Sequence, residues 1–109
     1  MYSDLQRKVE NHLLMNVGLP AEQLNKFIRE SAAHLRSAMS VLDEAIDEGD
    51  FEVIISSAHK LKGGLSNLGL EEFSEIAGNI EITAAGNTPA YLGCYFMRLR
   101  MGLKAFLEQ

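Results

Sequence analysis

The sequence predicts an all-α protein, an up-and-down four-helix bundle with an additional short N-terminal helix. Apolar residues recur at three- and four-residue spacing along five segments, which is typical of helices with one buried side. Glycine or proline separates these segments, and no segment shows the alternating pattern of a strand. The 109 residues suffice for one modest core, so we expect a single domain over residues 1–109.

The first two helices are predicted from their boundary signals. Residues 3–6, Ser-Asp-Leu-Gln, have the form of a capping box, and a short helix follows to about Met15. Residues 18–20, Gly-Leu-Pro, separate this helix from the next one, and proline suits the first turn of that next helix. That second helix is the longest and extends over 21–49, where a glycine provides a natural stop.

Three further helices follow with short connections. Asp50 is placed to cap a third helix over 51–68. The helix that follows is predicted to begin near Glu71, Glu72 and Glu75, because acidic residues favour the N-terminal end of a helix. This fourth helix ends at the Gly-Asn pair 86–87. Thr88 and Pro89 fit an N-cap and a first helical position, so they open a last helix that continues through Phe106.

The third helix carries the most informative residues. Its apolar stripe consists of Phe51, Ile54, Ile55, Ala58, Leu61, Leu65 and Leu68. At about 3.6 residues per turn, His59 lies on the flank of this stripe and should face water, with Gly63 one turn further on. Lys62 lies nearer the stripe, so its stem can lie on the bundle while its ammonium reaches toward the imidazole.

Two interpretations account for Gly63 and Gly64, which each cost roughly 0.5–1 kcal/mol relative to alanine in mid-helix. In the first, His59 is a core residue and the glycines let a neighbouring helix pack closely. That interpretation places His59 off the stripe and leaves the charge of Lys62 unexplained. In the second, His59 is an exposed nucleophile for an anionic group, uncrowded by Gly63 and served by the Lys62 cation. The second explains more residues.

Charge and composition exclude several function classes. The net charge is −5, from 15 acidic against 10 basic residues, which argues against nucleic-acid binding. No apolar run of 18 residues and no signal-peptide pattern occur, so we expect a cytoplasmic protein that does not enter a membrane.

The remaining histidines and the single cysteine predict no further site. His12, His34 and His59 share no short ligand spacing, so no metal site is expected. Cys94 has no partner for an internal disulfide, and we expect it to be semi-buried and to serve packing.

The segment Ala58-His59-Lys60-Leu61-Lys62-Gly63-Gly64, followed by Leu68-Gly69, resembles the signature of the histidine-containing phosphotransfer (HPt) family. That signature is a small residue, His, two positions, Lys, Gly, small residues and a Leu-Gly helix end. Gly64 departs mildly from it, since Ser or Ala is common there. Glu81, after Ile80 on the next helix, also resembles a Leu-Glu feature of the family. The motif resemblance covers about residues 50–81.

The resemblance implies a role for each matching residue. His59 would be the phosphoacceptor, Lys62 would assist the phosphoryl group, and Gly63 would keep the approach open. Lys62 would gain a charged partner only once the imidazole carries phosphate. The expected partner-binding residues on the same helix are Lys60, Gly64, Ser66 and Asn67.

The resemblance also implies a function, partners and an absence of cofactors. The chain would be a monomer that accepts phosphate from a receiver-domain aspartyl phosphate and passes it to a response-regulator receiver within a two-component phosphorelay. Its partners would be receiver domains and a hybrid sensor histidine kinase, and the divalent metal would belong to the receiver. No phosphate-binding loop is present, so the chain is expected not to be an ATP-dependent enzyme. The alternative is a non-phosphorylated module that docks on a receiver or inhibits it.

Overall fold

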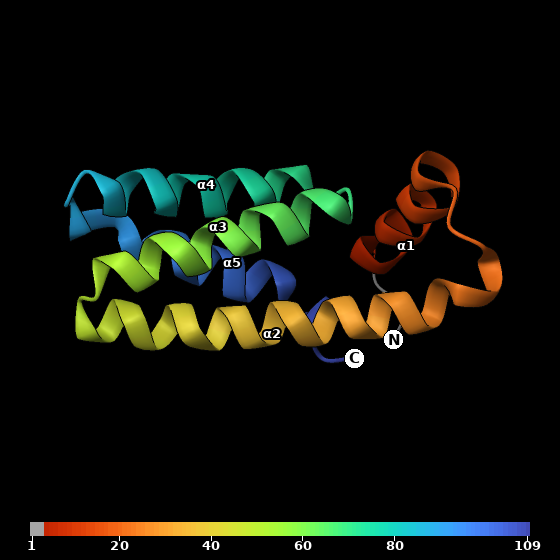
Figure 1. The fold of residues 1–109 in the computed structure, drawn as a ribbon, viewed down its shortest axis with the longest axis horizontal. Coiled ribbons are helices and arrows are strands. Elements are labelled where there is room, and N and C mark those ends of the chain that lie inside the picture. The colour runs from red at the N-terminus through yellow and green to blue at the C-terminus, as the bar shows by residue number, and fades with distance from the viewer. Residues whose placement is uncertain (1–3) are drawn as a thin grey trace.

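The computed structural model describes residues 4–109 and confirms the predicted all-α class (Figure 1). Its α-helices are α1 (Asp4–Asn11), α2 (Leu24–Glu48), α3 (Phe51–Asn67), α4 (Glu71–Ala85) and α5 (Leu92–Leu107). Helices α2 to α5 each pack against the next in the chain, and α5 returns to α2, which closes the up-and-down bundle. Within these residues, no helix combines the length and the apolar character needed to cross a bilayer.

The core of the bundle includes most of the stripe predicted on α3. Its fully buried members are Ile54, Ala58, Leu61, Leu65 and Leu68. Phe51 and Ile55 lie partly buried at its margin. Because the stripe determines which side of α3 faces inward, it also determines which residues α3 presents to solvent.

The N-terminal segment differs from the single helix expected to about Met15. Helix α1 ends at Asn11, and residues His12–Val17 continue as a π-helix that a left-handed Gly18 terminates, with φ 79°. The carbonyl oxygen of Leu13 accepts from the backbone N–H of Gly18, five residues later, in the π-helical pattern. The predicted capping box begins at Ser3, which lies outside the described residues.

This segment covers the end of the bundle where α3 and α4 meet (Figure 1). Val9 and Leu13 are fully buried in the same core as the longer helices. His12 lies against Gly69, which has φ 78°, and a Cβ at Gly69 would come within 2.5 Å of His12 Cγ. Glycine is therefore required at 69 both by the backbone conformation and by the contact with His12.

The junction between α2 and α3 follows the prediction. Gly49 ends α2 in the left-handed region, with φ 68°. Asp50 caps α3, because its side chain accepts a hydrogen bond from the backbone N–H of Val53 at 3.3 Å.

The start of α5 confirms the positions predicted for Thr88 and Pro89 but not the capping bond: Thr88 is the N-cap residue of a short turn with proline at its start. Residues Pro89–Tyr91 form a 3₁₀ turn, and α5 begins only at Leu92. The Thr88 hydroxyl donates to the Gly86 carbonyl oxygen at 3.2 Å and makes no capping bond to the turn. The hydroxyl is thus oriented toward Gly86, and its oxygen accepts no hydrogen bond from the backbone of the turn.

The expectation for Cys94 was wrong. Leu92, Phe96 and Leu99 direct the buried side of α5 inward, and Cys94 lies exposed on the opposite side.

Arg36 ties α2 to the carboxyl end of α5. Its Nη1 donates to the carbonyl oxygens of Leu107 at 2.6 Å and Gln109 at 3.0 Å, where helical carbonyls lack partners within the helix. We expect Arg36→Met to lower the free energy of unfolding by about 1–2 kcal/mol, as charged hydrogen bonds at a partly solvated position contribute. Urea unfolding measures the change.

Arg29→Met is the matched control for Arg36→Met. Arg29 is exposed on the same helix and makes no hydrogen bond or ion pair with any residue that the structure describes. Its replacement should leave the urea midpoint nearly unchanged. Equal effects of the two substitutions would contradict the role assigned to Arg36.

Candidate functional site

His59 lies on the solvent side of α3, with 67% of its side chain exposed. Its neighbours Ala58 and Leu61 are fully buried, so the helix directs the imidazole outward just as the apolar stripe predicted. The interpretation of His59 as a core histidine is therefore wrong. The ring remains tied to the bundle by one contact on the α4 side.

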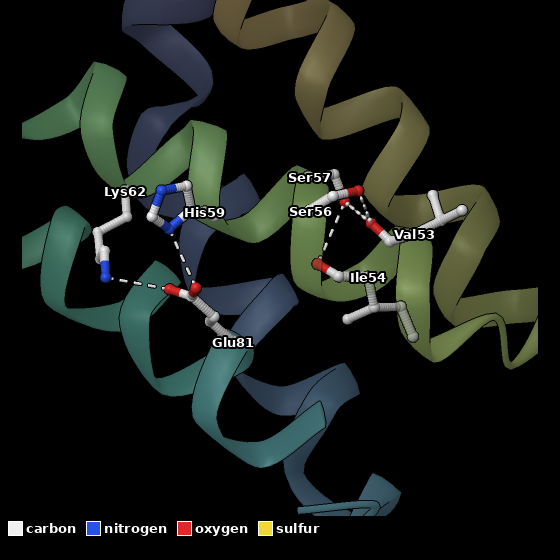
Figure 2. A network of polar contacts seen from close by, with 7 residues as sticks. All are labelled: Val53, Ile54, Ser56, Ser57, His59, Lys62 and Glu81. Atoms are coloured by element: carbon white, nitrogen blue, oxygen red, sulfur yellow. Dashed lines mark hydrogen bonds and ion pairs between the residues drawn. The ribbon is translucent and has the colours of Figure 1, made fainter. Parts of the chain in front are cut away.

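That contact is Glu81 of α4, whose carboxylate lies between two side chains of α3 (Figure 2). Its Oε2 is 3.0 Å from His59 Nδ1, and its Oε1 is 3.0 Å from Lys62 Nζ. Only 23% of the Glu81 side chain is exposed, against 43% for Lys62. The least exposed member of the cluster therefore holds the two more exposed ones.

The charge of Glu81 is stabilised by its two partners. Burial raises the pKa of this carboxyl, but hydrogen bonds from Lys62 and His59 and their positive charge outweigh burial and lower the pKa below its ordinary value of 4.5. Glu81 is consequently ionised at neutral pH and acts only as a hydrogen-bond acceptor.

An acceptor at Glu81 determines which nitrogen of His59 carries the proton. Since a carboxylate cannot donate, Nδ1 must carry a hydrogen to make the 3.0 Å contact. In the neutral ring Nε2 then holds the free lone pair. The arrangement therefore leaves one ring nitrogen available as a nucleophile on an exposed side chain.

The position of Lys62 corrects an expectation. Its ammonium was expected to gain a charged partner only after His59 carries phosphate, yet it already pairs with Glu81. The pattern of α3 does not indicate this ion pair, because α3 contains no acidic residue from Val53 onward. The partner, Glu81, comes from the adjacent helix.

The two glycines of the motif have different surroundings. A Cβ at Gly63 would meet no atom within 4 Å, so the space above this exposed residue is open. A Cβ at Gly64 would lie 3.2 Å from Leu35 Cδ2 of α2. Close packing between helices therefore explains Gly64, but it does not explain Gly63.

The expected partner-binding residues lie on both sides of α3. Lys60 and Gly64 line a hollow of about 350 Å³ between α2 and α3, and Asn67 lines a second hollow beside it, of about 250 Å³. Ser66 lies on the α4 side, where its hydroxyl donates to Glu71 Oε1 at 3.4 Å. The structure thus brings His59 and Lys62 together and distributes the other predicted residues around them.

Glu81 is the site residue that sequence reasoning did not assign. One signal was available, because Glu81 is the only acidic residue between Glu75 and Glu108 and follows the buried Ile80. An acid that is largely buried beside the apolar side of a helix is favoured by a partner of opposite charge. Sequence does not reveal which residue of another helix provides it.

Comparison with known proteins identifies the family of the chain. Within the described residues, no three His, Cys, Asp or Glu side chains form a group that could hold a metal ion. No curated protein and no solved structure gives a significant match to the chain. The model of the Hpt domain family matches residues 22–108. The exposed histidine and its lysine lie within that match, and the chain belongs to the Hpt domain family.

Proposed function

We propose that His59 accepts a phosphoryl group from the aspartyl phosphate of one receiver domain and passes it to the aspartate of another. Membership of the Hpt family implies histidine phosphotransfer within a phosphorelay. The observation that carries the assignment to His59 is its 3.0 Å contact from Nδ1 to Glu81 on a side chain that is 67% exposed. That contact holds the ring and leaves Nε2 free.

The transfer requires one bond to form and one to break. The Nε2 lone pair attacks phosphorus, and the P–O bond to the receiver aspartate breaks, which returns the electron pair to that carboxylate. Nδ1 keeps its proton, and Glu81 stabilises the positive charge that the phosphorylated ring acquires. In the second transfer, the aspartate carboxylate of the other receiver attacks phosphorus. The N–P bond breaks, and its electron pair returns to Nε2.

Lys62 supports the transferred group in this proposal. Its ammonium lies beside the same carboxylate that holds His59 and is 43% exposed, so rotation about its stem can bring it to a phosphoryl oxygen. Glu81 then loses one cation as the phosphoryl group gains it. Lys62 thus exchanges one anionic partner for another.

The receiver would dock over the exposed side of α3 around His59, Gly63 and the α2–α3 hollow. That hollow presents apolar surface from Leu35 and Val41 beside the Lys60 ammonium. An apolar contact with a cation at its edge complements an acidic receiver pocket. The open space above Gly63 leaves room for the receiver backbone.

The test is to incubate the chain with a panel of receiver domains that carry ³²P on their aspartate, without ATP. The proposal expects label on the chain that is labile to acid and stable to base. The alternative, a docking or inhibitory module, expects receiver binding without label. If receivers bind the chain but none transfers its phosphoryl group, the relay is excluded. As a control, incubation of the chain with labelled ATP and no receiver should give no label.

Lys62→Met separates the charge of Lys62 from its packing. Methionine keeps most of the stem and removes the ammonium, so we expect transfer to His59 several-fold slower. The free energy of unfolding should fall by only about 0–1 kcal/mol, the usual contribution of a partly exposed ion pair. Rapid-quench transfer rates and urea unfolding measure the two effects.

Lys104→Met provides the same change of net charge on α5, where Lys104 is exposed. It should leave the transfer rate unchanged. A large loss of stability in Lys62→Met with a normal transfer rate would make Lys62 a structural residue instead.

A further inference from the structure

Three residues of α4 lie along different parts of Lys62. The hydroxyl of Ser74 donates to the Lys62 carbonyl oxygen at 2.9 Å, and Glu81 Oε1 lies 3.0 Å from the ammonium. Between them, a Cβ at Gly78 would lie 3.3 Å from Lys62 Cδ. Positions 74 and 78 are four residues apart and positions 78 and 81 are three apart, so all three lie on one side of α4. In this order they lie beside the backbone, the stem and the ammonium of Lys62.

Gly78 is unfavourable for the helix that contains it. It lies in the interior of α4, where glycine is less stable than alanine, and its φ is not in the left-handed region. The atom that its missing side chain would meet most closely belongs to Lys62. The backbone conformation at 78 therefore does not require glycine, and the nearest neighbour of a side chain there would be the lysine stem.

We propose that Gly78 is a positioning residue, which keeps the Lys62 stem low across α4 so that its ammonium reaches Glu81 beside His59. The proposal rests on the phosphotransfer role of this cluster. A Cβ at 78 would be tighter against Lys62 Cδ than an ordinary contact, at 3.3 Å, so the stem would shift by a few tenths of an ångström, and a larger side chain would displace it further. Gly78 also borders a hollow of about 410 Å³ next to Lys62 and Ile82, so a larger side chain can turn into solvent without disturbing the core.

The direct test titrates the Glu81 carboxyl by ¹³C NMR in the parent chain, Gly78→Ala, Gly78→Leu and Lys62→Met. Because Lys62 contributes to the lowered pKa of Glu81, its removal should raise that pKa. We expect Gly78→Leu to give nearly the same upward shift as Lys62→Met and Gly78→Ala a smaller one. Combining Gly78→Leu with Lys62→Met should add no further shift.

Gly93 supplies the matched control on α5. A Cβ there meets no atom within 4 Å, so Gly93→Ala and Gly93→Leu make the same chemical changes away from Lys62. Both should leave the Glu81 pKa unchanged. Melting temperatures should not fall in either alanine variant, since alanine favours a helix over glycine.

Transfer from a phosphorylated receiver gives the functional measurement. Gly78→Leu should slow it several-fold, as Lys62→Met does, and the double variant should be no slower than Lys62→Met. An unchanged Glu81 pKa in folded Gly78→Leu would overturn the proposal. If no receiver phosphorylates the parent chain, the relay fails while the titration still decides whether Gly78 positions Lys62.

Discussion

Replacement of His59 by glutamine should abolish phosphoryl labelling from a receiver and leave the bundle folded. The side chain is 67% exposed, so the substitution removes no core contact, and the glutamine amide can still donate to Glu81. We therefore expect a change of less than about 1 kcal/mol in the free energy of unfolding, as for most surface substitutions. Autoradiography after transfer measures the label, and circular dichroism measures the fold.

His12→Gln and His34→Gln are the controls, because they remove the other two histidines of the chain. His12 lies against Gly69 and His34 is exposed on α2, away from Glu81 in both cases. Both variants should label normally. Acid-labile, base-stable label on His59→Gln would reject His59 as the acceptor.

A glutamate at Gly63 should reduce transfer to background. The open space above this residue means that its side chain would enter the region where we propose that the receiver approaches, and it would add a negative charge opposite the acidic pocket expected there. The fold should persist, because no atom lies within 4 Å of the added Cβ. Transfer kinetics, together with receiver binding by calorimetry, measure the effect.

Gly63→Ala distinguishes bulk and charge from the loss of glycine itself. Alanine should raise the free energy of unfolding by roughly 0.5–1 kcal/mol, as expected for an unstrained helical site, while transfer stays close to that of the parent. Normal transfer in Gly63→Glu would refute the idea that Gly63 keeps the approach open.

The helices and the outward direction of His59 were predictable because both depend on local periodicity. Ala58 and Leu61 are buried, and this alone places His59 in solvent. The π-helix at His12–Val17 was not predictable, because its six residues are too few for the apolar pattern to distinguish α from π bonding. The position of Thr88 before Pro89 was predictable, but the direction of its hydroxyl was not, because that depends on the local path of the chain at Gly86.

Glu81 shows what single-helix patterns omit. The spacing of apolar residues in α3 predicts the side of that helix on which Lys62 lies. The spacing in α4 does the same for Glu81. The 3.0 Å contact also depends on how far the two helices are offset along their axes, which side-chain packing determines. A displacement of one residue, about 1.5 Å, would be enough to disturb both contacts of the carboxylate.

The N-terminal segment, α1 with the π-helix that follows it, belongs to the core of the bundle but lies outside the region that matches the family. The part shared with the family begins at residue 22, whereas the part that completes the core begins no later than Val9. Val9 and Leu13 are fully buried, and each contributes about 1.5–3 kcal/mol by leaving water, a substantial fraction of the 5–15 kcal/mol that stabilises a typical domain. Because residues 9 and 13 lie outside the region that matches the family and inside the shared core, we expect the N-terminal segment to unfold together with the bundle rather than before it.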